Sequence, residues 1–442
     1  MHSHKILSWV RPSRFVIAAV NIGGALEWYE IGLFISWSLI IQQKADFFEE
    51  SITDSLNVVG VLLMVGFALA SGGARGIGGW FFGKMGDKEG RKRAFSLSIL
   101  LATLPSLIVP LISFFVSYEE WMRYSSIIFA IVKFLQGMPA GGEFPGAICF
   151  LAETGNIYHN SPSWISRRYM CSYTILGPQI GLMLSMIVCL ILKNLFSEEF
   201  LLRQGWQFIF LISGVMGVGG FIVRKKLHET ASFLNLKAHH EIALHPVRII
   251  FSKYLSRVSF GFILSIFETV LFIVTSLTPL FYSKDPFGLS YNQIIYFSLA
   301  STILRTIFLI LIGRFLVKYS KFPWLKTSAW GIIFLSFFLY ESLVKGSLLF
   351  SILINIAIIF LYSIQAAILP SLLAELFPTR VRYTGIAFSF NICDGILLTV
   401  VTSICFLLIS NNSASFVFLL TISGVIFLIN MKNKLSNKPY YK

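Results

Sequence analysis

Eight charged side chains lie inside long apolar stretches of this sequence. They are Glu27, Glu30, Arg75, Lys133, Glu143, Glu268, Arg305 and Asp394. A charge at the centre of an apolar helix costs roughly 2.5 to 3.5 kcal/mol on insertion scales, so each needs a partner, a water-filled cavity or a function. Buried carboxylates can exchange protons, and buried cations can bind anionic groups. The alternative is a set of ion pairs that holds helices together.

The spacing of these residues places several of them on shared helical faces. Glu27 and Glu30 stand three residues apart, as do Lys133 and Gln136, and residues at this spacing are neighbours on a helix. Glu143 returns to the face of Gln136 about two turns later. The sequence therefore predicts polar groups that converge inside a helical protein.

The composition indicates that membrane-spanning segments position these charged residues. A mean hydropathy of +0.76 and a charged fraction of only 13% are typical of an integral membrane protein, because soluble chains are about 25% charged. A membrane span needs about 20 mostly apolar residues. Twelve stretches qualify, at 15–41, 57–84, 94–117, 124–151, 170–193 and 206–224, and at 254–282, 291–317, 324–343, 348–373, 384–409 and 414–431. The first is too long for the apolar region of a cleavable signal peptide.

Charge sets the orientation of these spans. The net charge of +15 would indicate a nucleic-acid partner in a soluble chain. Most of the 36 basic residues, however, fall on one side of the membrane, Arg224 among them, if the amino terminus is inside. Because basic residues collect in cytoplasmic loops, we predict cytoplasmic termini and no nucleic-acid partner.

A hydrophilic stretch at 83–93 joins the second and third predicted spans. It contains Gly83, Asp87, Lys88, Gly90, Arg91 and Lys92. Its glycines permit a tight turn, and its basic cluster favours the cytoplasmic face. Taken alone, the stretch could be a basic loop that only sets topology.

The two halves of the chain share landmarks. Arg75 lies twelve residues before Asp87, and Arg305 lies twelve before Val317. At the same offset Gly83 matches Gly313 and Lys88 matches Lys318, and the tripeptide Leu-Ala-Glu ends both the fourth span, at Glu153, and the tenth, at Glu375. This repetition predicts two pseudo-symmetric six-helix bundles, 1–224 and 254–442, joined by a polar inner linker at 225–253 that has no apolar period.

Several motifs resemble those of the metabolite:proton symporter branch of the major facilitator superfamily. The stretch at 83–92 matches Gly-x-x-x-Asp-Arg/Lys-x-Gly-Arg-Arg/Lys between helices 2 and 3 of that superfamily. The matches extend over nearly the whole chain, to 24–30, 75–79, 136–143, 152–153, 205–207, 229–233 and 374–383. The chain departs from the branch pattern at Glu30, Gly76, Gln207 and Val317.

The resemblance implies a fold and a gate. The fold is all-α, with twelve transmembrane helices in two bundles in a bacterial inner membrane. Asp87 would lie near the inner start of helix 11, at 383–385, where helix amides favour an anion. A glycine face at Gly72, Gly76, Gly79 and Gly83 would let helices approach and slide. The gating residues would be Gly83, Asp87, Lys88, Gly90, Arg91, Lys92, Glu153, Glu375, Arg380 and Arg382.

The resemblance also implies alternating-access symport of a small zwitterionic osmolyte, of the proline or betaine type, with protons. We expect Glu30 to exchange the proton, with Glu27 and Glu143 as further candidates. Arg75 and Lys133 would bind the substrate's carboxylate, and the other candidates for substrate binding are Gln136, Asp394 and Arg305. Substrate binding could then alter proton affinity and couple the two fluxes.

Two other functions stay open, a symporter of dicarboxylates or other organic acids and a non-transporting sensor derived from a transporter. An enzyme is not expected, because no nucleophile, metal or cofactor arrangement is evident. The seven histidines lie outside the predicted spans, and the five cysteines lack metal-ligand spacing. We expect a monomer surrounded by lipid, with no cofactor and no metal. Aromatic residues could bind a quaternary ammonium group, but the sequence does not indicate which.

Overall fold

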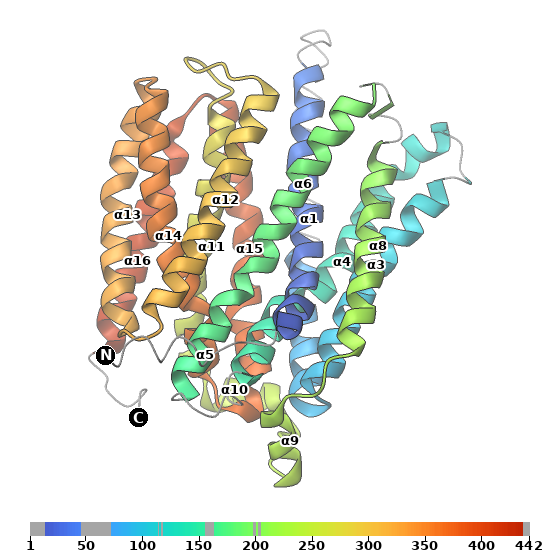
Figure 1. The fold of residues 1–442 in the computed structure, drawn as a ribbon, viewed down its shortest axis with the longest axis vertical. Helices are drawn as coiled ribbons and strands as arrows, with labels where there is room; N and C mark the ends of the chain where they lie inside the picture. Colours follow the sequence, from blue (N-terminus) through green and yellow to red (C-terminus); the bar gives the residue numbers. More distant parts are fainter. Residues whose placement is uncertain are drawn as a thin grey trace.

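The computed structural model describes residues 14–45, 72–113, 115, 118–154, 163–197, 200–201 and 205–435. Within these ranges the regular elements are helices, most of them long and running side by side (Figure 1). One helix, described over residues 72–88, carries no label and is called the 72–88 helix here. The long helices are α1 (Arg14–Ala45), α3 (Arg91–Ser113), α4 (Tyr118–Thr154), α6 (Leu176–Leu195), α8 (Trp206–Lys225), α11 (Leu255–Phe281), α12 (Tyr291–Leu316), α13 (Lys321–Val344), α14 (Leu348–Leu376), α15 (Arg382–Ser410) and α16 (Phe418–Leu435).

Nine helical stretches within the described ranges are long and apolar enough to cross a membrane. One of them, 165–195, combines the short helix α5 (Ser163–Ser172) with α6 through a single 3₁₀ turn. The predicted count of twelve remains a prediction, because most of the expected span at 57–84 lies outside the described residues. Both chain termini, which we predicted to be cytoplasmic, also lie outside them.

The long helices pack in two groups (Figure 1). In the N-terminal helix group, α1 packs on α6 and α8, and α3 packs on α4 and α8. In the C-terminal helix group, α11 packs on α14, α15 and α16, and α13 packs on α14 and α16. Contacts between α4 and α15, between α5 and α14, and between α6 and α12 join the two groups.

Glycines let the 72–88 helix lie directly against α15. A Cβ atom at Gly72 would collide with the backbone of Gly395, and one at Gly79 would collide with Asn391. At Gly83 a Cβ atom would come within 3.0 Å of the Cα of Thr384. The predicted contact at Gly76 is wrong, because that position faces open space. The close contact therefore follows the spacing 72, 79, 83, which keeps one helical face toward α15.

The segment between the two groups contains two short helices, α9 (Ala231–Ala238) and α10 (Pro246–Lys253). The predicted linker had no apolar period, and eight residues are too few to show one clearly. Local signals start these helices instead. The Thr230 side chain accepts a hydrogen bond from the backbone N–H of Phe233, and Pro246 occupies the first turn of α10, where its missing N–H costs nothing.

The glycine contact gives a matched test. Gly72→Val should lower the free energy of unfolding in detergent by about 1–3 kcal/mol more than Gly76→Val, because only the first side chain is forced into a neighbouring backbone. Both substitutions make the same change in helix propensity. Equal destabilisation by the two variants in chemical denaturation would show that the close approach does not limit stability.

Candidate functional site

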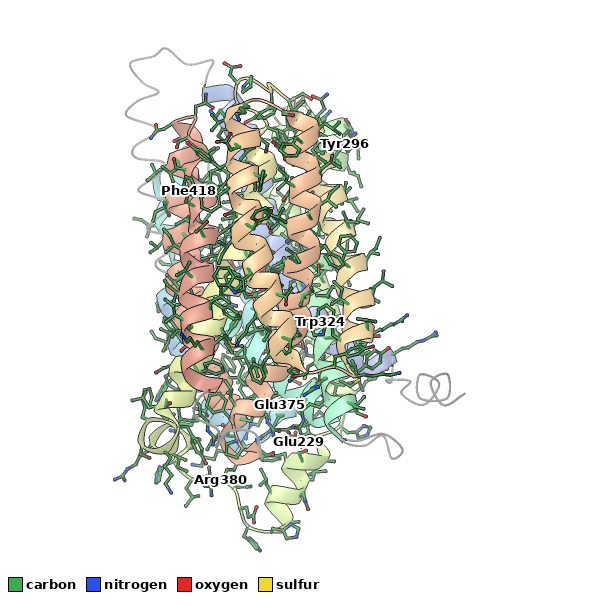
Figure 2. All side chains as sticks on the ribbon, turned by 90° about the vertical axis from the view of Figure 1, so that its left-hand side faces the viewer. Glu229, Tyr296, Trp324, Glu375, Arg380 and Phe418 are labelled. Atoms are coloured by element: carbon green, nitrogen blue, oxygen red, sulfur yellow. The ribbon has the colours of Figure 1, made fainter. Side chains whose placement is uncertain are left out.

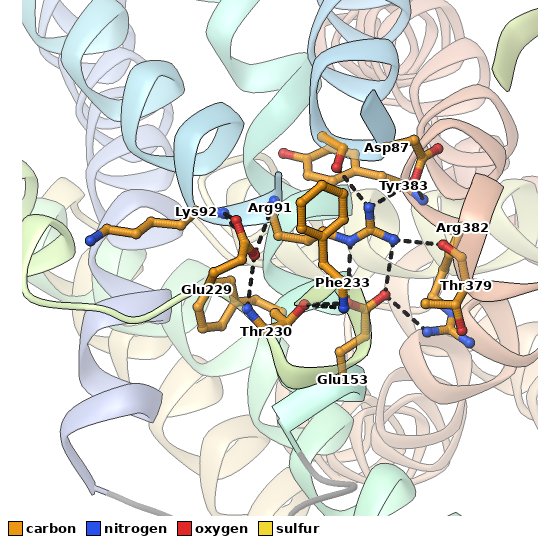
Figure 3. A network of polar contacts seen from close by, with 12 residues as sticks. Asp87, Arg91, Lys92, Glu153, Glu229, Thr230, Phe233, Thr379, Arg382 and Tyr383 are labelled. Carbon is orange, nitrogen blue, oxygen red and sulfur yellow. Dashed lines mark hydrogen bonds and ion pairs between the residues drawn. The ribbon is translucent and has the colours of Figure 1, made fainter. Parts of the chain in front are cut away.

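Arg91 lies at the centre of a buried polar network (Figure 3). Its guanidinium contacts both oxygens of Glu153 at 3.2 Å. It also donates to the carbonyl of Gly86 at 2.7 Å and lies 3.4 Å from Asp87. Both Arg91 and Glu153 are fully buried. Removal of one partner of such a pair strongly destabilises the folded protein, because the other charge is left buried without a partner.

The same network joins the two helix groups. Arg382, at the start of α15, binds Glu153 at 3.0 Å, and Arg91 donates to the carbonyl of Thr379 at 2.6 Å. Glu153 therefore binds one arginine from each group.

Asp87 makes a second junction between the groups, at the start of α15. It accepts backbone hydrogen bonds from Tyr383 at 3.2 Å and Thr384 at 2.9 Å. This contact confirms the predicted position of Asp87, at a helix N-terminus where free N–H groups favour an anion. Burial raises the pKa of Asp87, which lies beyond the predicted span, to about 6, although Arg91 and these N–H groups favour the charged form.

The segment around α9 completes the network. Glu229 accepts the backbone N–H groups of Arg91 at 3.1 Å and Lys92 at 3.2 Å, and Thr230 donates to Glu153 at 2.6 Å. The ring of Phe233 lies 4.9 Å from the Arg91 guanidinium. Sequence reasoning missed these three roles. Their only signal was the Glu-Thr-x-x-Phe motif at 229–233, whose partner could not be inferred from the sequence.

Of the other predicted gating residues, Gly90 shapes the backbone, whereas Lys88 and Arg380 lie on the surface. Gly90 has a φ of 121°, a backbone conformation that favours glycine, and it forms the turn before α3. Lys88 and Arg380 are exposed. Figure 2 shows Arg380, Glu229 and Glu375 at the same end of the molecule. The structure therefore brings together Asp87, Arg91, Glu153 and Arg382, but not Lys88 and Arg380.

Glu375 forms a second, smaller cluster. Lys321 binds it at 2.9 Å, and Arg168 of the N-terminal helix group approaches it to 3.8 Å. Lys321 follows Arg91 by the same 230 residues that separate Arg75 from Arg305. Each half of the repeat therefore ends a helix in a glutamate that contacts cations from both helix groups.

In the interior, Arg75 joins the groups again. It contacts Glu27 of α1 at 2.5 Å and Asp394 of α15 at 2.9 Å, and its Nε donates to Asn391 at 3.4 Å. Arg75 and Asp394 are buried. The structure therefore brings Arg75, Glu27 and Asp394 together, and two carboxylates already bind Arg75.

Glu143 pairs with Arg224, a residue that the sequence places on the inner side of the membrane. Arg224 makes two contacts with its carboxylate, at 2.6 and 2.8 Å, and Ser98 adds a hydrogen bond at 2.5 Å. The guanidinium of Arg224 lies 3.5 Å from the centre of the Phe95 ring. The inner side of the membrane stays a prediction for Arg224, but its position at the end of an apolar stretch gave no sign that its side chain points back into the helix group.

Glu30, Gln136 and Lys133 form a chain of hydrogen bonds within the N-terminal helix group. Glu30 accepts from Ser106 at 2.6 Å and also from Ser213. Gln136 donates to Ser106 at 3.0 Å and accepts from Lys133 at 3.2 Å. The predicted shared face of Lys133 and Gln136 is confirmed, and the two serines supply hydroxyl partners that the sequence did not identify.

Aromatic rings meet between the two helix groups. Trp28 of α1 packs on Phe272 of α11 with centroids 4.6 Å apart, and Phe144 of α4 packs on Phe390 of α15 at 4.3 Å. Arg305 lies beside Phe272 in the C-terminal helix group.

A cavity of about 10 Å³ lies next to these rings. Trp28, Phe144, Glu27 and Glu143 line it together with Asn21, Thr174 and apolar neighbours. It has room for about one water molecule, so this conformation is closed to a larger ligand here. The described part of the chain holds no group of three or more His, Cys, Asp or Glu residues suited to a metal.

The buried pair of Glu143 and Arg224 gives a stability test. Glu143→Gln should cost about 3–5 kcal/mol of unfolding free energy, because it leaves Arg224 buried beside a neutral group. The matched control is Glu341→Gln, whose exposed partner Lys345 should make that loss less than about 0.5 kcal/mol. Similar losses in the two variants, measured by denaturation in detergent, would contradict this account of the pair.

Comparisons with known proteins agree with this architecture. The chain is 27% identical to the proline/betaine transporter of Salmonella typhimurium, over 96% of this chain and 84% of that protein. It is 26% identical to the glycine betaine/proline/ectoine/pipecolic acid transporter OusA of Dickeya dadantii, over 86% and 74%. The solved structure of the proton:xylose symporter XylE superposes with a TM-score of 0.76 at 15% identity, over 96% of this chain and 95% of that one.

A family model described as Major Facilitator Superfamily matches residues 31–395. This match covers most of the chain and agrees with the helical fold and with the resemblance seen in the sequence. The protein lies in the bacterial inner membrane, as its apolar helices and its relatives indicate. The chain belongs to the Major Facilitator Superfamily and is a membrane transporter rather than an enzyme.

Proposed function

We propose that the protein carries a small zwitterion of the proline or betaine type together with protons, by alternating access. The observation that carries the proposal is the meeting of charged and aromatic side chains from both helix groups around Arg75, Trp28 and Phe272. Groups that meet in this way can separate when the helix groups move apart. The name of one relative includes glycine betaine and proline, and the name of the other includes proline and betaine.

The aromatic pairs favour a substrate with a cationic end. The rings of Trp28, Phe144, Phe272 and Phe390 lie between the helix groups, and aromatic faces attract quaternary ammonium groups. A dicarboxylate would need several free cations at the same place. Arg75 already binds two carboxylates, and Lys133 bonds to Gln136 within the N-terminal helix group.

Glu30 is the proton carrier in this proposal. Protonation of Glu143 would leave the buried Arg224 without its carboxylate, and protonation of Glu27 would take one of two carboxylates from Arg75. Glu30 instead accepts hydrogen bonds from the hydroxyls of Ser106 and Ser213. Glu30 forms no ion pair with the residues that the structure describes, so it can take a proton without breaking one there, which suits a group that must gain and lose charge in each cycle.

The network around Arg91 and Glu153 acts as the inner gate. In the described conformation it joins the two helix groups at one end, where the sequence predicts the cytoplasmic face. Substrate release to the inside would require Arg382, Thr379 and the start of α15 to leave their partners. The energy for this would come from binding substrate and proton more tightly in the state where the gate is open.

Uptake into proteoliposomes tests the proposal. The assay uses labelled proline, glycine betaine and 2-oxoglutarate, with and without an imposed inward proton gradient. The wild type should accumulate proline and betaine only with the gradient, and Glu30→Gln should abolish accumulation, because glutamine cannot carry the proton. Glu89→Gln, a change at an exposed pair with Arg93, should leave uptake unchanged.

Each other outcome has a distinct meaning. Accumulation of 2-oxoglutarate alone would favour an organic-acid symporter. Accumulation that is the same with and without the proton gradient would contradict proton coupling. Ligand binding without any accumulation would favour a sensor derived from a transporter.

A further inference from the structure

Arg305 differs from the other arginines buried in the helix groups. It lies in α12 with only 1% of its surface exposed. Arg75, Arg91 and Arg224 each contact a carboxylate within 3.5 Å, whereas Arg305 forms no ion pair within the described ranges. Its Nη1 donates to the hydroxyl of Ser276 at 3.2 Å, and its Nε has no hydrogen-bond partner there.

A nearby carboxylate could neutralise Arg305 but is held by another group. Glu268 of α11 accepts a hydrogen bond from the hydroxyl of Tyr362 at 3.0 Å. The rings of Tyr362 and Phe272 lie 5.4 and 5.3 Å from the guanidinium. These rings give the cation partial stabilisation but no hydrogen-bond acceptor for Nε. A charge so buried needs a stronger partner in some state of the protein.

The position of Arg305 connects it to the contact between the helix groups. Phe272, one of its two rings, packs on Trp28 at 4.6 Å, and Trp28 lines the small cavity. A ligand that parts Trp28 from Phe272 would therefore reach the guanidinium. Arginine suits a carboxylate, because its planar N–H groups can bind both carboxylate oxygens.

We propose that Arg305 binds the carboxylate of the transported substrate and that Tyr362 keeps Arg305 available by holding Glu268. The proposal rests on the proposed function and makes it more specific. Arg75, which two carboxylates already bind, then serves to join the helix groups rather than to bind substrate. The cationic end of the substrate lies toward Trp28, on the other side of Phe272.

A comparison of choline with glycine betaine isolates the contribution of the carboxylate to binding, because both ligands carry a trimethylammonium group and only betaine has a carboxylate. Equilibrium binding of each is measured on purified full-length protein in detergent, for the wild type, Arg305→Gln and Tyr362→Phe. The matched control is Arg314→Gln, the same change at an exposed position of the same helix.

Arg305→Gln should weaken betaine binding by about 30-fold or more, the effect of losing one partner of a buried charge pair. It should change choline binding by less than about threefold, since choline makes no such pair. Tyr362→Phe keeps the ring but releases Glu268 toward Arg305, so it should weaken betaine binding selectively and by a smaller factor. Arg314→Gln should change neither.

Equal loss of both ligands in Arg305→Gln would indicate a structural role and overturn the proposal, and so would an unchanged preference for betaine. If Arg305→Gln does not fold, Tyr362→Phe decides, because an unchanged betaine preference in that variant would overturn the proposal. A wild type that binds neither betaine nor proline would contradict the proposed function itself, and the role of Arg305 would fall with it.

Discussion

A charge inside a membrane protein is costly unless another charge or polar group compensates it, and this constraint organises the structure. Three arginines, Arg75, Arg91 and Arg224, each tie helices together through a carboxylate. Arg75 does so across the contact between the helix groups, and Arg224 does so within one group. Arg91 binds Glu153 within one group and reaches the other group through its hydrogen bond to the Thr379 carbonyl. Ion pairs between the groups can exchange partners during a cycle, whereas the pair within one group can stay intact.

The two halves of the repeat satisfy this constraint differently. In the first half Arg91 and Glu153 are fully buried and make several hydrogen bonds. In the second half Lys321 replaces the arginine and binds Glu375, which is partly exposed. A lysine supplies a point charge and lacks the planar fork of arginine, and Val317 stands where the first half has Asp87. The first half therefore carries the more extensive junction.

Much of this arrangement could be predicted from the sequence, because hydropathy and rare charges are local signals. The helices that could be compared follow the expected stretches, and Asp87 contacts the start of α15 as expected. Partner choice was harder to predict. The pair of Glu143 and Arg224 joins residues 81 positions apart, and only the folded helices bring them together. The open position of Gly76 likewise depends on how α15 crosses the 72–88 helix.

The partners of the aromatic residues were equally hard to predict from the sequence. Forty-three phenylalanines offered no sequence signal that would single out Phe272 and Phe390. Their importance comes from lying opposite Trp28 and Phe144 across the contact between the helix groups. In the second half of the repeat Val317 stands where the first half has Asp87, yet Lys321 and Glu375 form an ion pair like that of Arg91 and Glu153.

We propose that the network around Glu153 holds together the ends of the two helix groups that the sequence predicts to be cytoplasmic. The most direct test measures the alkylation rate of a single cysteine introduced by Ala387→Cys. Ala387 is a buried residue of α15 that faces Gly83. The five native cysteines, all buried, are first replaced by alanine. Alkylation by a water-soluble maleimide should be slow in this parent and about tenfold faster or more once Glu153→Gln is added, because a lost buried pair shifts the equilibrium by at least that factor. Equal rates in the parent and in the Glu153→Gln variant would contradict the claim.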